Sequence, residues 1–97
     1  MKVNIQSIHF DADVKLINFI EEKVAKLAHF HEGITGNEVF LRLDKSSDAE
    51  NKIVEIKIHI PGNDLFAKKQ CKSFEEATDL AVDALKIQVK KHKEKVK

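Results

Sequence analysis

The sequence predicts an α+β fold, a two-layer sandwich in which a four-stranded sheet carries two helices on one face. Four short segments alternate apolar and polar residues or are bounded by turn residues, which is typical of strands. Two longer segments repeat apolar residues every three or four positions, which is typical of helices. Their order along the chain is β-α-β-β-β-α, and two amphipathic helices suffice to cover the apolar face of such a sheet.

A strand and a helix open the chain. The segment KVNIQSI alternates Val3 and Ile5 with polar residues, which predicts a strand with one buried face. Asp13 is typical of a helix N-cap, because its carboxylate accepts a hydrogen bond from a free N–H of the first turn. The pattern then predicts a helix near 14–30, whose apolar residues recur at Leu16, Ile20, Val24 and Leu27. Gly33 and Gly36 fit the turn that ends it.

The middle of the chain predicts three strands joined by short turns. NEVFLRLD and KIVEIKIHI both alternate cleanly, and the polar loop KSSDAEN between them favours an antiparallel hairpin. PGND follows and predicts a tight turn by residue type. The last segment, LFAKKQC, is less regular, and its polar residues predict an edge strand or a partly exposed face.

The chain ends in a second predicted helix. Ser73 and Glu76 form the pattern of a capping box, and a core stripe follows at Phe74, Ala77, Ala81 and Leu85. No Gly or Pro interrupts the segment. A helix of about 25 residues is roughly 37 Å long, so its end should project beyond the sheet.

Composition predicts a single domain spanning residues 1–97. The chain is 42% hydrophobic and 34% charged, which is typical of a soluble globular protein. It shows no apolar run long enough for a signal peptide or a membrane span, and the single Cys71 has no partner for an internal disulfide. We therefore expect a cytoplasmic protein with no membrane partner.

The chemistry-bearing residues do not predict an enzyme. Cys71 lies beside Lys69 and Lys72, which favours a low thiol pKa, but no base is placed to act with it, and we expect a packed bystander. His29 and His31 lack further ligands at metal spacing. No catalytic triad or phosphate-binding glycine loop is present. We expect no cofactor, no metal and no small-molecule substrate.

Positive charge is concentrated at the end of the chain. The last twelve residues, KIQVKKHKEKVK, hold six of the seventeen Lys and Arg and one acid, while the whole chain carries a formal +1. Compensation of the helix dipole explains only the terminal turn. At about 100° per residue, one sector of about 60° holds Lys86, Lys90, Lys93 and Lys97, and the other flank holds Lys91 and Lys95. A polyanion, most commonly nucleic acid, would relieve the repulsion within such a face.

The first predicted helix adds Lys23 and Lys26 to this basic surface, with His29 one turn further on. No motif for reading bases is present. A solvated helix end remains the simplest alternative. A general RNA-binding module and a protein-interaction module that regulates transcription also remain open.

Several segments together resemble the ribosome hibernation-promoting factor and ribosome-associated translation inhibitor family. They are HFDADVKLINFIEEKVAKL, VFLRLDK, IPGNDLFAK and SFEEATDLAVDALKIQVKKHKEKVK. The order of elements agrees over the whole chain. The resemblance is to the short form of the family, which has no second domain.

The resemblance implies a stress or stationary-phase factor that binds the small ribosomal subunit and its rRNA in the decoding cleft. Bound there, it would exclude mRNA and tRNA. Carried over by position, the implied rRNA contacts are Lys23, Lys26, Lys45, Lys90, Lys91, His92, Lys93 and Lys95, and the charge pattern adds Lys86. The chain departs from the family at Ala84 and Ile87, where basic residues are usual, so we expect a rotated or weaker basic face there.

Overall fold

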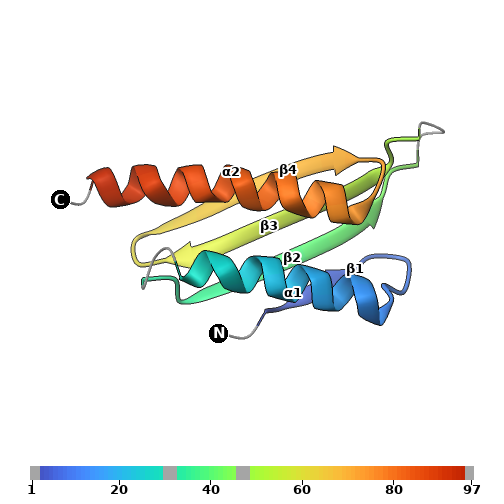
Figure 1. The fold of residues 1–97 in the computed structure, drawn as a ribbon, viewed down its shortest axis with the longest axis horizontal. Helices are drawn as coiled ribbons and strands as arrows, with labels where there is room; N and C mark the ends of the chain where they lie inside the picture. Colours follow the sequence, from blue (N-terminus) through green and yellow to red (C-terminus); the bar gives the residue numbers. More distant parts are fainter. Residues whose placement is uncertain (1–2, 30–32, 46–48, 96–97) are drawn as a thin grey trace.

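The computed structural model describes the backbone of residues 3–29, 33–45 and 49–95, and the side chains of these ranges as far as His92. The described chain contains one four-stranded mixed sheet whose strand order follows the sequence (Figure 1). β1 runs parallel to β2, and the other neighbouring pairs are antiparallel. The predicted fold class and element order are confirmed, with bounds β1 Ile5–Ser7, α1 Val14–Ala28, β2 Gly36–Leu43, β3 Lys52–Ile60, β4 Asn63–Cys71 and α2 Phe74–Lys95.

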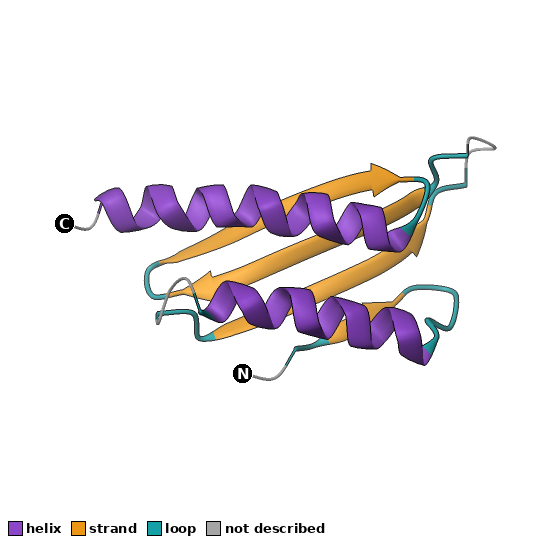
Figure 2. Ribbon diagram, viewed as in Figure 1, coloured by secondary structure: helices purple, strands orange, loops and turns teal. Residues whose placement is uncertain are grey.

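The two helices form one layer and the sheet forms the other (Figure 2). Strand alternation directs one set of apolar side chains toward the helices, and α1 and α2 return apolar stripes of their own. The fully buried centre of this core contains Ile20, Val24, Leu27, Val39, Leu41, Val54, Ile56, Ile58, Ala77, Ala81 and Leu85. The predicted core stripe of the last helix is therefore confirmed.

Local side-chain hydrogen bonds fix where each helix begins. The Asp13 carboxylate accepts a hydrogen bond from the backbone N–H of Leu16 at 2.8 Å, which confirms the predicted N-cap. The Ser73 hydroxyl oxygen accepts one from the backbone N–H of Glu76 at 3.1 Å. Among the described residues, the reciprocal bond, which the backbone N–H of Ser73 would donate to the Glu76 carboxylate, is not formed, so the capping box is half present.

The sequence predicted the turn between β3 and β4 correctly and misplaced one residue of the turn after α1. Pro61 and Gly62 form the two-residue turn between β3 and β4, and Gly62 supplies the positive φ of +78° that this turn requires. Gly36 was predicted to belong to the turn after the first helix, and that was wrong. It is the first residue of β2 and pairs with His59 of β3, while Gly33 does lie in a turn.

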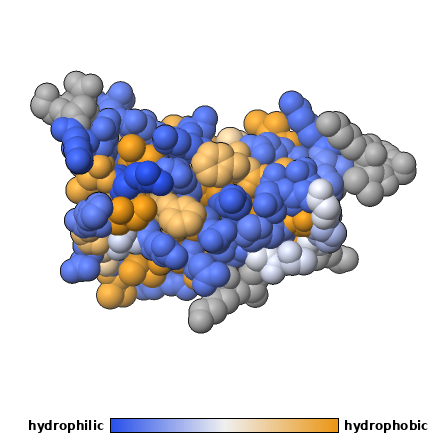
Figure 3. Space-filling view, turned by 180° about the vertical axis from the view of Figure 1, so that it is seen from behind, coloured by the Kyte–Doolittle hydropathy of each residue, from blue (hydrophilic) through white to orange (hydrophobic). Residues whose placement is uncertain are grey.

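The opposite face of the sheet is open to solvent. Seen from behind, it is largely hydrophilic with separate apolar side chains among the polar ones (Figure 3). Phe66 points to this side, since its neighbours Leu65 and Ala67 are buried, and it is 47% exposed. β4 is an edge strand, as its irregular pattern predicted.

Candidate nucleic-acid interface

The C-terminal ends of both helices lie at the same end of the molecule. α1 and α2 run side by side in the same direction, and the end of α2 extends beyond the turn between β3 and β4, as predicted (Figure 1). Lys26 lies in the last turn of α1, and Lys90, Lys91 and His92 lie in the last turns of α2. The fold therefore gathers these basic residues at one end, which we call the basic end.

Lys23 joins the two helices. Its Nζ lies 3.2 Å from Oδ1 of Asp79 on α2, and 5.4 Å from the centre of the Phe19 ring. The predicted basic surface thus contains an ion pair that partly neutralises Lys23. A contact between Lys23 and rRNA stays a prediction.

The ion pair also shows which flank of α2 faces α1. At about 100° per residue, Lys86 and Lys90 project within about 40° of Asp79, so both lie toward α1. Lys86 itself lies 4.0 Å from Asp83, one turn earlier on α2. The inner part of this flank is therefore mixed in charge, and Lys90 lies beyond it toward the end of α2.

The opposite flank of α2 lies over β4. Gln88 Nε2 donates a hydrogen bond to the backbone oxygen of Phe66 at 2.8 Å. Lys91 follows Gln88 by one turn on this side. Ile87 lies on the outward side of α2 between these two flanks and is 58% exposed. Ala84, one turn earlier, packs partly against the core. The structure thus places Ile87 where an additional basic side chain would face solvent.

Three lysines at the basic end have no ion-pair partner among the described side chains. In the part of the chain whose side chains are described, no carboxylate lies within salt-bridge distance of Lys26, Lys90 or Lys91. All three are exposed. Their ammonium groups can therefore bind phosphate without first breaking an ion pair.

Lys45 does not join this cluster. It follows the end of β2, where Leu43 pairs with Lys52 and Lys52 pairs with Cys71, immediately before α2 begins. Lys90 lies about 24 Å further along α2. Lys45 therefore lies at the opposite end of the molecule, and its contact with rRNA stays a prediction.

Two further predicted contacts lie partly outside the described structure. The backbones of Lys93 and Lys95 belong to α2, but their side chains lie outside the described residues. His31, one of the two histidines considered for a metal site, lies wholly outside the described residues. Within the described ranges, no group of three or more His, Cys, Asp and Glu side chains is arranged to hold a metal ion.

Cys71 is buried at the end of β4. Burial raises the pKa of its thiol, and the nearby carboxylates of Glu76 and Glu50 raise it further. The lysine-rich setting in the sequence favoured a low pKa, and that interpretation is wrong. The packed bystander that we expected is what the structure contains.

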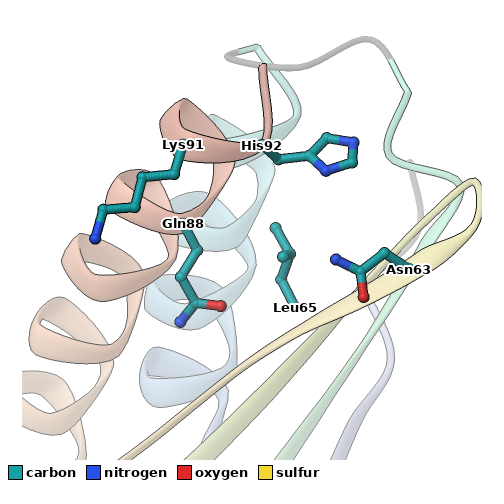
Figure 4. A pocket seen from close by; sticks show the side chains of 5 residues that line it. All are labelled: Asn63, Leu65, Gln88, Lys91 and His92. Carbon is teal, nitrogen blue, oxygen red and sulfur yellow. The ribbon is translucent and has the colours of Figure 1, made fainter. Parts of the chain in front are cut away.

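Sequence reasoning missed a notch at the basic end, between the start of β4 and the last turns of α2 (Figure 4). Its volume is about 200 Å³, and it is lined by Asn63, Leu65, Gln88, Lys91 and His92. The signal that could have revealed it is the spacing of Gln88, Lys91 and His92, which are three and four residues apart and so share a face.

No helix within the described ranges combines the length and the apolar character needed to cross a bilayer.

Comparison with known proteins gives consistent relatives. Residues 3–97 match the model of the family described as Sigma 54 modulation protein / S30EA ribosomal protein. The ribosome hibernation promoting factor of Pseudomonas putida is 32% identical over 95 residues, which cover 98% of this chain and 89% of the relative.

Two solved structures share the fold. A ribosomal subunit interface protein from Coxiella burnetii superposes with a TM-score of 0.81 at 21% identity, covering 96% of this chain and 98% of the other. The N-terminal domain of Protein Y from Thermus thermophilus gives a TM-score of 0.76 at 24% identity, covering 93% and 94%.

Proposed function

Since the chain belongs to the Sigma 54 modulation protein / S30EA ribosomal protein family, we propose that it is a ribosome-associated hibernation factor of the cytoplasm. The family that the sequence resembles is thereby confirmed, and relatives bear the name ribosome hibernation promoting factor. In the proposed function, residues 1–97 act as one ribosome-binding domain. This domain binds the rRNA of the small subunit in the decoding cleft during stress or stationary phase.

The observation that carries the proposal is the basic end. Lys26 lies in the last turn of α1, Lys90 on the flank of α2 turned toward α1, and Lys91 on the opposite flank, each exposed and without a carboxylate partner among the described side chains. Like charges gathered at one end of the molecule repel one another, and phosphates of an RNA backbone relieve the repulsion with release of counterions.

The proposed mechanism is occupancy rather than catalysis. Helices packed on a sheet form a rigid body, so any surface of RNA that the domain covers is closed to other ligands. In the decoding cleft those ligands are mRNA and tRNA, and their exclusion stops translation. The lysines supply affinity through phosphate contacts and do not read bases, which suits a site defined by the shape of folded rRNA.

Competition tests this mechanism directly. Small subunits carrying fluorescent mRNA and initiator tRNA are titrated with the chain, and release of both labels is followed. The proposal predicts that the chain displaces both and that excess mRNA and tRNA raise the chain concentration needed. Simultaneous binding of chain, mRNA and tRNA with unchanged affinities would contradict the decoding cleft as the site.

The family description itself favours a second candidate, modulation of the transcription factor sigma 54. In that case the basic end would bind an acidic protein surface rather than RNA. Nuclease treatment separates the candidates, because an RNA-dependent complex is lost when its RNA is digested and a protein complex is retained.

A further inference from the structure

The notch at the basic end has an apolar floor and polar walls. Asn63 and Leu65 are alternate residues of β4 and point to the helix side, where Leu65 is 7% exposed. Gln88 and His92 are one turn apart on α2 and close the other side. Figure 4 shows the Asn63 amide and the His92 ring on either side of the space above Leu65, while Lys91 extends away from it.

The polar groups around this floor suit hydrogen bonding in one plane. Gln88 Nε2 is already committed to the backbone oxygen of Phe66 at 2.8 Å, which fixes the amide. Its oxygen lies on the side of Leu65 (Figure 4) and remains an acceptor. Asn63 adds a second amide with both a donor and an acceptor. Paired amides of this kind recognise the edges of nucleobases.

The size and charge of the notch limit which ligands can bind there. About 200 Å³ is less than the roughly 300 Å³ at which drug-sized ligand pockets begin, so a single ring system fits better than a large cofactor. Asp64, the residue after Asn63, points to the opposite sheet face, where its Oδ1 lies 2.9 Å from His59 Nδ1. Its carboxylate therefore does not face an anion bound in the notch.

We infer that this notch binds one unpaired nucleobase of the RNA that the basic end contacts. The inference rests on the proposed function, which supplies the RNA. The base lies on Leu65 and stacks against the His92 ring, and the amides of Asn63 and Gln88 bond its edge. Lys91, which lines the rim of the notch and extends away from it, binds the phosphate of the same nucleotide. The site would therefore add recognition of an unstacked nucleotide to an otherwise shape-based contact.

A titration of the whole chain tests the notch without a ribosome. Adenosine 5′-monophosphate is added to isotope-labelled protein, and the side-chain amide signals of Asn63 and Gln88 are followed by NMR. Ribose 5-phosphate is the matched control, because it carries the same sugar and phosphate without the base. We expect the nucleotide alone to shift both amides at millimolar concentration. Equal shifts with ribose 5-phosphate, or none with either, would overturn the inference.

Binding to small subunits gives the second measurement. Asn63→Ala with Gln88→Ala removes both amides and no charge, and we expect about tenfold weaker binding with an unchanged salt dependence. Asn18→Ala, on the exposed side of α1, is the control. Unchanged affinity of the double variant would overturn the notch while leaving the proposed function intact. Failure of the wild-type chain to bind would instead refute the proposed function, and the nucleotide titration would still decide the notch.

Discussion

Neutralising two lysines of the basic end should weaken ribosome binding by a predictable amount. Lys26→Gln with Lys90→Gln removes one exposed charge from each helix. Neither lysine has a carboxylate partner among the described side chains, so the fold should be unaffected, with a stability change within about 0.5 kcal/mol. The slope of log K against log salt is negative, and each lost phosphate contact reduces its magnitude by about 0.7 to 0.9.

Two lost contacts therefore reduce the magnitude of the slope by about 1.4 to 1.8. If affinities converge near 1 M salt, the variant binds roughly 25- to 60-fold more weakly at 0.1 M. The assay is fluorescence anisotropy of labelled protein with small subunits at several salt concentrations. The expected plot shows two lines that approach each other as salt rises.

A matched variant isolates position from net charge. Lys68→Gln with Lys72→Gln removes the same charge from exposed lysines, one on the open sheet face and one before α2. We expect this control to keep nearly the wild-type slope. An unchanged slope in the Lys26 and Lys90 variant, or an equal loss in the control, would refute the assignment of phosphate contacts to the basic end.

Three further predictions concern single residues. Ile87→Arg should tighten binding to small subunits and steepen the salt slope by about 0.9, because Ile87 is 58% exposed between two basic flanks; Val14→Arg, at a site 71% exposed on the first turn of α1, is the control, and an equal gain there would contradict the geometry. His59 lies between two carboxylates on the open sheet face, and hydrogen bonds to Asp64 and then to Glu38 raise its pKa. Protonation therefore stabilises the fold fully below about pH 6.5, and this contribution is lost as pH rises through the raised pKa; thermal melts should show the decline in wild type and not in His59→Gln, and identical pH profiles would contradict it. The buried Thr78 hydroxyl has no hydrogen-bond partner among the described residues, so Thr78→Val should raise the free energy of unfolding by about 1 kcal/mol in urea titrations, and a decrease would show that the hydroxyl is satisfied.

The regular elements were predictable because their signals are local. The strand predicted over 52–60 has those bounds in the structure, since strict alternation ends at Pro61, which lacks a backbone N–H. Asp13 and Ser73 marked the helix starts because a cap acts within three residues. Gly36 was misassigned because a glycine signals a turn in general, and its pairing with His59 depends on a distant strand.

The candidate site was predictable only in part, because its geometry depends on packing between distant segments. The sequence indicated Lys26, Lys90 and Lys91 through charge and helical spacing. It did not indicate that Lys23 pairs with Asp79 across the helix interface, since that contact depends on how α1 and α2 are aligned. Nor did it separate Lys45 from the rest, because the strand register determines at which end of the molecule β2 ends.

The notch was missed for the same reason. Asn63 is the first residue of β4 and Gln88 lies on α2, and neither residue carries charge. Residue types that bind through amides are common on every protein surface, so their positions become informative only when the fold brings them around a shared apolar floor.

Co-sedimentation across a salt series tests the central claim most directly. Purified chain is mixed with small subunits, large subunits and intact ribosomes, and with naked duplex RNA as a control for general RNA binding. The account predicts saturable binding to small subunits and intact ribosomes that weakens as salt rises, with much weaker binding to large subunits and duplex RNA. Absence of binding to small subunits at low salt, or equal affinity for duplex RNA, would contradict it.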